Sequence, residues 1–164
     1  MDGQMNIRYT FSNFIMNGIG ADIMIIIQCL LYCRMNNINF FMNQNDDWKM
    51  LVCCMLLNQT NRKQVDTIRY KLFNVYPTAK HMMKAKPEIL VEILRPLGLY
   101  NRRAKSLIKM SEGYVKGLPV DKLYGIGRYA LDSWEIFQCG NHNVQPTDLV
   151  LQEYLRQENN FIDT

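Results

Sequence analysis

The chain has 164 residues, enough for one domain with a substantial core and too few for two domains of ordinary size. Its 19 lysines and arginines outnumber its 15 acids to give a net charge of +4, which permits a polyanionic partner without requiring one. Five cysteines, two of them adjacent, argue against a disulfide framework and favour a reducing compartment, and the absence of a C-x-x-C pair gives a zinc or iron–sulfur site little support.

Residues 1–45 differ from the rest of the chain because they carry only four charged residues and many asparagines. Within them, residues 23–33 are nearly all apolar, but this stretch is too short to span a bilayer and is interrupted by Gln28. It also lacks the small-residue cleavage site of a signal peptide. The segment either packs on the following domain or is poorly ordered. We therefore predict a divergent N-terminal segment at 1–45 and one domain at 46–164.

From residue 46 onward the hydrophobic pattern is helical and no stretch alternates as a strand does, so the domain is predicted to be all-α. Residues 48–57 are almost continuously apolar, which is typical of a helix buried on all sides of a bundle. A second, amphipathic helix is stopped by Pro77. A short helix capped by Thr78 follows, and then one that opens with Pro87. The last of these is predicted to bury Ile89, Leu90, Ile93 and Leu94.

A basic run belongs to the next predicted helix, for which Asn101 is a plausible cap. Residues 94–110 contain five cations and no acid: Arg95, Arg102, Arg103, Lys105 and Lys109. We expect this helix to turn its arginines and lysines outward and to bury Ala104, Leu107, Ile108 and Val115. A merely solvated helix face and a surface for a polyanion both account for such a run.

Gly125 and Gly127 bracket one aliphatic residue just before a helix predicted from Arg128 to Cys139. Such a pair makes a tight hairpin, because glycine adopts positive φ and lets the backbone approach a ligand closely. If the helix points its N-terminus outward, its amides and dipole form a site for a phosphate or another anion. Taken alone, the motif is more often an ordinary turn between helices. The helix is expected to bury Ala130, Leu131, Trp134 and Phe137.

Four motifs, in order, resemble the helix-hairpin-helix DNA glycosylase superfamily. They are L-x-N-Q-T at 56–60, P-L-G-L-Y-N-x-R-A-K at 96–105, L-Y-G-I-G-R-Y at 123–129 and V-x-P-x-D at 144–148. The likeness covers about two-thirds of the chain, and within the superfamily it is strongest to the methyl-CpG-binding domain 4 glycosylases. Those enzymes act on thymine and uracil mispaired with guanine.

The resemblance implies a base-flipping enzyme and gives roles to individual residues. Gln59 and Leu99 match the wedge that fills the gap left by a flipped nucleotide. Asp148 matches the catalytic aspartate, which stabilises positive charge on the sugar and orients water. Tyr129 stands where related endonucleases carry a lysine nucleophile, so it is expected to line the base pocket and to form no Schiff base. Contacts to DNA phosphates are assigned to Gly125, Gly127, Arg128, Arg103 and Lys105.

We therefore expect an all-α helix-hairpin-helix glycosylase fold without an iron–sulfur cluster, and a monofunctional DNA N-glycosylase that leaves an abasic site. The expected partner is double-stranded DNA with a mismatched or damaged base. We expect no cofactor, no metal and no membrane, and a monomer that is nuclear in a eukaryote and otherwise intracellular. Two alternatives stay open: a non-catalytic helix-hairpin-helix DNA-binding module, and a glycosylase for a different damaged base. Asp148 could also simply cap the last helix, which is predicted to begin at Thr147 or Asp148.

Overall fold

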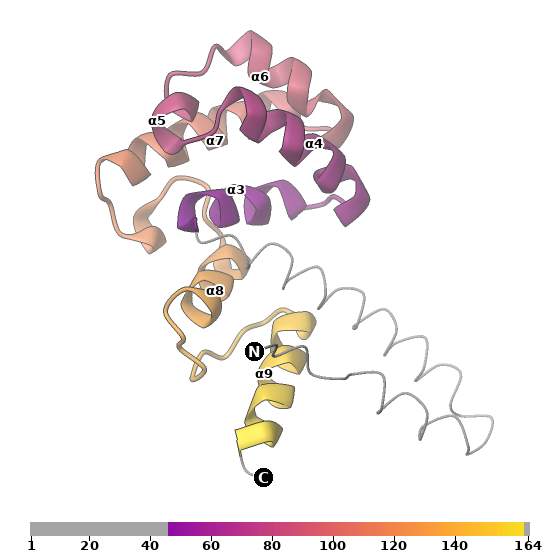
Figure 1. Cartoon of the computed structure of the whole chain (residues 1–164), viewed down its shortest axis with the longest axis vertical. Coiled ribbons are helices and arrows are strands. Elements are labelled where there is room, and N and C mark those ends of the chain that lie inside the picture. Colours follow the sequence, from indigo (N-terminus) through magenta and orange to yellow (C-terminus); the bar gives the residue numbers. More distant parts are fainter. Residues whose placement is uncertain (1–45, 163–164) are drawn as a thin grey trace, which may run out of the picture.

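The computed structural model of the protein describes residues 46–162 (Figure 1). The prediction made for residues 1–45 lies outside the described residues. The elements are α3 (Asp47–Leu57), α4 (Arg62–Val75), α5 (Ala79–Met82), α6 (Pro87–Leu94), η1 (Arg95–Leu97), α7 (Tyr100–Val115), η2 (Val120–Lys122), α8 (Arg128–Phe137) and α9 (Leu149–Ile162). No strand occurs between residues 46 and 162, which confirms the all-α prediction for that part of the chain.

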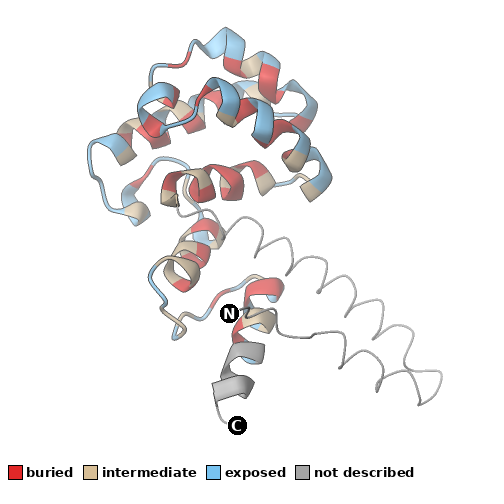
Figure 2. Cartoon of the chain, in the orientation of Figure 1, coloured by how far each residue is buried: buried red, intermediate tan, exposed pale blue. Residues whose placement is uncertain are grey.

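Helix α3 is the central element, as its almost continuously apolar sequence predicts. Helices α4 and α7 pack on one side of it and α8 packs on the other (Figure 1). Asp46 caps its N-terminus by accepting a hydrogen bond from the backbone N–H of Lys49 at 3.1 Å. Most of its surface is buried (Figure 2), and the buried residues are Trp48, Met50, Leu51, Val52, Cys53, Cys54 and Leu56. The helix therefore serves as the scaffold from which the surrounding loops extend.

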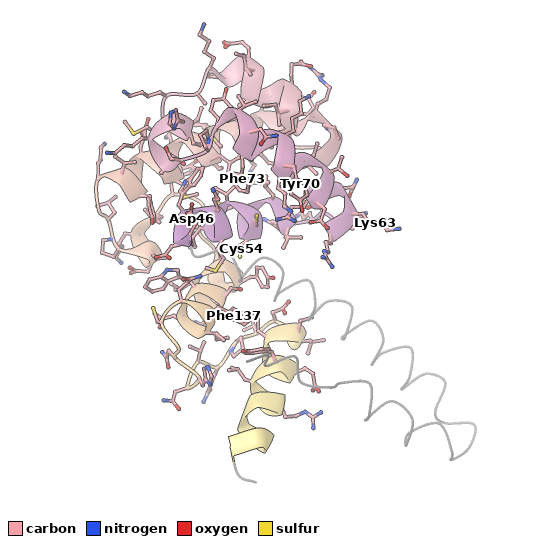
Figure 3. The ribbon with its side chains drawn as sticks, viewed as in Figure 1. Asp46, Cys54, Lys63, Tyr70, Phe73 and Phe137 are labelled. Atoms are coloured by element: carbon pink, nitrogen blue, oxygen red, sulfur yellow. The ribbon has the colours of Figure 1, made fainter. Side chains whose placement is uncertain are left out.

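Trp48 ties α3 to two neighbouring helices. Its Nε1 donates a hydrogen bond to Ser111 Oγ of α7 at 2.9 Å. Its ring meets the ring of Phe73 on α4 edge-on, with the centroids 5.8 Å apart. Phe73 is labelled in Figure 3. The side chain is 2% exposed, and a buried indole needs such a partner for its N–H. These contacts fix α4 and α7 against α3 within one large hydrophobic cluster.

A smaller hydrophobic cluster joins α8 to α9. Phe137 of α8, labelled in Figure 3, packs on Tyr154 of α9 with the ring centroids 4.8 Å apart. Tyr129, in the first turn of α8, packs against both the large and the small cluster. The buried members of the smaller cluster are Ile136, Val150, Leu151 and Leu155. Tyr129 thus lies at the junction of the two packed units.

The structure corrects the predicted start of α7. The helix begins at Tyr100, and its N-cap position is Leu99 in the left-handed conformation, so Asn101 does not cap it. Gly98 also has positive φ, at 69°, and these two consecutive residues with positive φ turn the chain straight into the helix. Asn101 is already inside the first turn, where its side chain is exposed.

Several predicted core positions are also wrong. Ile89 on α6 is 47% exposed and Val115 on α7 is 37% exposed, because each lies beyond the stripe that its helix packs on its neighbours. Helix α8 packs on α3 and joins the α9 cluster, which shifts its buried face. That face consists of Ala130, Asp132, Ser133 and Ile136. The predicted Leu131, Trp134 and Phe137 are only partly buried.

Two further properties concern membranes and metals. No helix within residues 46–162 is long and apolar enough to cross a membrane. In the same part of the chain, no group of three or more histidine, cysteine or acidic side chains is placed to hold a metal ion. The described cysteines are free thiols, with Cys53 and Cys54 buried and Cys139 exposed.

Candidate functional site

A cleft of about 1270 Å³ is formed by loops and helix ends from distant parts of the chain. Its walls are the end of α3 with residues 58–61, the start of α7, the glycine hairpin with the start of α8, and the beginning of α9. All but one of the predicted site residues line it: Gln59, Leu99, Arg103, Gly125, Gly127, Arg128, Tyr129 and Asp148. Lys105 is the exception, and lies exposed on α7 outside the cleft lining.

The cleft is electropositive. Its described lining contains one carboxylate, Asp148, and four arginines, Arg62, Arg102, Arg103 and Arg128. Two of these arginines have acidic partners on their own helices, because Arg62 pairs with Asp66 and Arg128 with Asp132. Arg102 is exposed. A concave surface with this excess of positive charge attracts a polyanion.

Gln59 and Leu99 have an unusual backbone. They are the only non-glycine residues in the described part of the chain with positive φ, at 58° and 49°. For a residue with a Cβ this conformation costs about 1–2 kcal/mol. Leu99 is in addition 54% exposed, although it is a large apolar side chain. Strained residues of this kind cluster at functional sites, and the two predicted wedge residues are where the strain occurs here.

Arg103 is buried, with 8% of its surface exposed, so its expected outward orientation is wrong. Its Nε donates to Gly98 O at 2.9 Å and its Nη2 donates to Asn58 O at 2.8 Å. Its Nη1 donates to Met55 O and Leu56 O, each at 3.2 Å. Burial lowers the pKa of the guanidinium. Because these donors are held by backbone carbonyls, the phosphate contact predicted for Arg103 gains no support from the structure.

The two glycines of the hairpin have different backbone conformations. Gly125 has φ of 77°, and a Cβ there would lie 3.1 Å from Met55 Cε, so the fold itself favours glycine. Gly127 has φ of −94°, which any residue adopts, and a Cβ there would meet nothing within 4 Å. The predicted positive φ therefore holds at Gly125 alone. At Gly127, the missing side chain instead leaves open space beside the cleft.

Gly127 is the N-cap residue of α8, and no side chain caps this helix end. The first N–H groups of an α-helix have no partner within the helix. The first turn of α8 lines the cleft through Arg128, Tyr129 and Ala130. An uncapped helix N-terminus at an electropositive cleft is an arrangement that suits an anion such as phosphate.

Arg128 links the start of α8 to the segment that leads to α9. Its Nε donates to both carboxylate oxygens of Asp132 at 2.8 and 3.0 Å, and its Nη2 donates to Gln145 O at 3.3 Å. The Asp132 side chain is 4% exposed, so Arg128 supplies the partner that a buried carboxylate needs. The Arg128 side chain is itself 60% exposed. Its predicted contact with a phosphate stays a prediction.

Asp148 caps α9 and also lines the cleft. Its Oδ1 accepts hydrogen bonds from Val150 N at 2.9 Å and Leu151 N at 3.2 Å, which is the capping role considered from the sequence. The residue is partly exposed, and its Oδ2 has no hydrogen-bond partner among the described residues. One oxygen thus orients the carboxylate while the other is available to a ligand.

Sequence reasoning gave no individual site role to several other residues that line the cleft. Arg102 and Ser106 line it together with Leu99 and Arg103, and the spacing of these four positions is that of one helix face, a signal present in the sequence. Cys54 also belongs to the lining but resembles an ordinary core residue, and burial raises the pKa of its thiol to about 12.

Comparison with known proteins shows which protein family the chain resembles. The HhH-GPD superfamily base excision DNA repair protein family matches residues 52–162. The chain is 36% identical over 113 residues to methyl-CpG-binding domain protein 4-like protein of Arabidopsis thaliana, covering 67% of this chain and 25% of that protein. It is 31% identical over 108 residues to thymine-DNA glycosylase of Aeropyrum pernix, covering 60% and 48%. It is 34% identical over 104 residues to thymine/uracil-DNA glycosylase of Pyrobaculum aerophilum, covering 58% and 45%. The chain thus spans a quarter to about half of the length of these relatives.

Solved structures agree with this assignment at the level of the fold. The structure of a thermostable thymine-DNA glycosylase is similar with a TM-score of 0.55 at 20% identity, over 68% of this chain and 60% of that one. A trapped endonuclease III–DNA covalent intermediate is similar with a TM-score of 0.54 at 20% identity, over 69% and 60%. The family model, the helical fold and the order of the motifs agree: the chain belongs to the HhH-GPD superfamily of base excision DNA repair proteins.

Proposed function

We propose that the protein is a monofunctional DNA N-glycosylase that excises thymine or uracil mispaired with guanine and leaves an abasic site. The observation that carries the proposal is one electropositive cleft that gathers two strained loop residues, an uncapped helix N-terminus and a carboxylate oxygen without a described partner. The names of two relatives, a thymine-DNA glycosylase and a thymine/uracil-DNA glycosylase, support the substrate class.

The first step is to bring the base out of the duplex. A base inside the stack cannot be reached, so the nucleotide must be flipped and its place filled. An exposed Leu99 and an exposed Gln59 on two walls of the same cleft suit this task, because one offers an apolar side chain and the other an amide. Their strained backbones support a functional rather than a packing role, since neither residue contributes to the buried core.

The second requirement is to fix the DNA backbone. The N-terminus of α8 offers N–H groups and a positive dipole end, and the open space at Gly127 lets a phosphate approach them. Such a contact sets the register of the protein on DNA without reading its sequence. The exposed Arg102 and the exposed part of Arg128 add positive charge beside it.

The chemical step is hydrolysis of the N-glycosidic bond. As the bond breaks, its electron pair leaves with the base and positive charge builds on the sugar. A carboxylate beside C1′ stabilises that charge and orients the water whose oxygen bonds to C1′. A proton from the water balances the departing base, so the products are a free base and an abasic sugar. Asp148 suits this role because its capping hydrogen bonds use only Oδ1.

The proposal excludes a strand cut by the enzyme itself. A lyase step needs an amine that forms a Schiff base with the sugar. Tyr129 occupies the first turn of α8 at the cleft, where it packs on both hydrophobic clusters, and a phenol cannot form that adduct. Tyr129 is therefore proposed as a wall of the base pocket.

The test uses end-labelled duplexes with a single G·T or G·U mismatch, incubated with the full chain and then split into two portions. We expect cleavage at the mismatch only in the portion treated with alkali, and no covalent adduct when borohydride is added during the reaction. Cleavage without alkali, or a borohydride-trapped adduct, would contradict the monofunctional assignment. Salt-dependent DNA binding with no release of any base from a panel of mismatched and damaged duplexes would instead support the non-catalytic binding module.

A further inference from the structure

We propose that Arg103 is a positioning residue that locks the loop of Gln59 and the loop of Leu99 into one rigid unit, so that both side chains engage the same site on DNA. The inference rests on the proposed function in one respect, because it gives the two residues their joint task. Arg103 touches neither DNA nor base in this role. It acts through the backbone of the two loops.

The key observation is which carbonyls Arg103 holds. Its Nη2 bonds the carbonyl of Asn58, the residue directly before Gln59. Its Nε bonds the carbonyl of Gly98, the residue directly before Leu99. The carbonyl of a residue lies in the same rigid peptide plane as the N–H of the next residue. One guanidinium therefore holds the peptide plane before Gln59 and the peptide plane before Leu99. The positive φ angle of each residue is the rotation between that plane and the rest of the residue, so Arg103 helps to hold both angles.

The remaining bonds anchor this unit to the core. Nη1 of Arg103 donates to the carbonyls of Met55 and Leu56 in the last turn of α3. The last carbonyls of a helix have no partner within it, and a cation near them is favourable. The hydroxyl of Thr60 also donates to Leu56 O. The two loops are thus tied to the central, buried helix of the fold, not only to each other.

An arginine is required for this arrangement, because its planar fork presents donors in several fixed directions at once. A lysine keeps the positive charge near the end of α3 but offers a single ammonium, which cannot reach both loops and the helix end with the same geometry. Arg103→Lys therefore keeps the positive charge at the end of α3 and removes the hydrogen bonds that link the two loops.

A matched control is available in Arg69. It is also buried, with 1% of its surface exposed, and its Nε donates to Asp66 on its own helix α4. It does not belong to the described lining of the cleft. Arg69→Lys therefore perturbs a buried guanidinium without touching the wedge loops, and reports the general effect of lost stability.

The experiment compares single-turnover release of uracil from a G·U duplex with release of uracil held in an unpaired bubble, where little flipping energy is needed. Misplacing a positioned group by about 1 Å costs on the order of 100-fold in rate. We expect a loss of this order for Arg103→Lys on the duplex and a much smaller loss on the bubble, while Arg69→Lys changes both substrates by the same factor. An equal loss on both substrates for Arg103→Lys, or a duplex rate equal to that of the wild type, would overturn the proposal.

A double-mutant cycle tests the route of the effect. If Arg103 acts through the wedge, Arg103→Lys should lower the duplex rate much less in a Gln59→Ala/Leu99→Ala background than in the wild type, because the side chains it positions are already absent. Fully additive losses would show that Arg103 acts elsewhere and would overturn the proposal.

Hydrogen exchange keeps this proposal separate from the proposed function. If the wild type releases no base from either substrate, the glycosylase assignment fails, yet the loop linkage is still decided in the free protein. We expect Arg103→Lys to speed amide exchange in residues 57–61 and 96–100 together, with no such change in Arg69→Lys. Unchanged exchange in either loop would overturn the linkage itself.

Discussion

Replacing Gly127 with alanine should weaken DNA binding while leaving the fold intact. The backbone at Gly127 has φ of −94° and ψ of 177°, and an added Cβ would meet no atom within 4 Å. Alanine lowers the entropy of the unfolded chain, a gain of about 0.4–1 kcal/mol. It is a poorer N-cap residue than glycine by about 0.5–1 kcal/mol. The two effects offset each other, so the free energy of unfolding should change by less than about 0.5 kcal/mol.

The effect on DNA comes from the space that the new methyl group fills. That space is where a phosphate would approach the N–H groups at the start of α8. A hydrogen bond to a charged group contributes about 1.5–3 kcal/mol, and its loss corresponds to binding weaker by about 10- to 150-fold. Because the lost donors are backbone N–H groups without a net charge, the dependence of log K on log salt should change by less than the value of about 0.9 expected for the loss of a lysine or arginine contact.

The assay is fluorescence anisotropy of a labelled G·T duplex at several salt concentrations, with thermal unfolding measured on the same samples. Gly125→Ala is the contrasting variant: its φ of 77° and the Met55 Cε 3.1 Å away predict a loss of about 1–2 kcal/mol of stability. If Gly127→Ala binds DNA with the affinity of the wild type, no phosphate sits at this helix end and the reasoning is refuted.

Two further predictions concern strain and thiol reactivity. Leu99→Gly should keep the stability near that of the wild type, because relief of about 1–2 kcal/mol of left-handed strain offsets the entropy cost of glycine. The same variant should slow base release from a duplex. Thermal unfolding checks the stability and single-turnover kinetics check the rate, and unchanged release would argue against a wedge role for Leu99. Burial raises the pKa of the Cys54 thiol to about 12, which keeps it protonated at mildly alkaline pH. Desolvation raises the pKa of Cys139 as well, but its thiol is exposed, so iodoacetamide should modify Cys139 and spare Cys54 until the protein is unfolded. Mass spectrometry that finds Cys54 alkylated in the native state as fast as Cys139 would contradict that prediction.

Much of the helical fold could be predicted because its signals are local. Thr78 accepts a hydrogen bond from His81 N as a cap should, and Pro87 opens α6. The almost continuously apolar run of residues 48–57 indicated a central helix, and α3 is one. Capping residues, prolines and hydrophobic spacing act within a few residues of where they stand, so they can be interpreted without knowing the rest of the fold.

Arg103 shows what a sequence pattern leaves open. In sequence it stands among basic residues and looks like part of an exposed face, although it shares a helix stripe with the buried Leu107 and Met110. Its partners at Met55, Leu56 and Asn58 lie 48, 47 and 45 residues away, and only the packing of α7 on α3 brings them within reach. Burial of an arginine depends on such distant carbonyls, so it was not predictable from spacing.

Asp132 and the backbone of Gln59 and Leu99 are further features that local sequence patterns do not predict. Asp132 lies four residues after Arg128, a spacing that predicts an ion pair but not that the carboxylate is buried. The positive φ of Gln59 and Leu99 is imposed by the surrounding loops, since glutamine and leucine have no intrinsic preference for it. The order of the motifs assigns roles to these residues, and those roles stay predictions, whereas the strain at Gln59 and Leu99 and the hydrogen bonds of Arg103 to their loops are properties of the folded chain.

The central claim is that Asp148 is the group beside the breaking bond, and Asp148→Asn tests it most directly. Asparagine caps a helix about as well as aspartate, so the hydrogen bonds to Val150 N and Leu151 N, and with them the stability, should be kept. A carboxylate about 4 Å from a developing positive charge is worth about 4 kcal/mol at an effective dielectric constant of about 20, which corresponds to a rate factor of about 1,000. We predict that the wild type releases thymine or uracil from G·T and G·U duplexes and that Asp148→Asn does so about 1,000-fold more slowly with the same melting temperature. Undiminished release by Asp148→Asn would contradict the account.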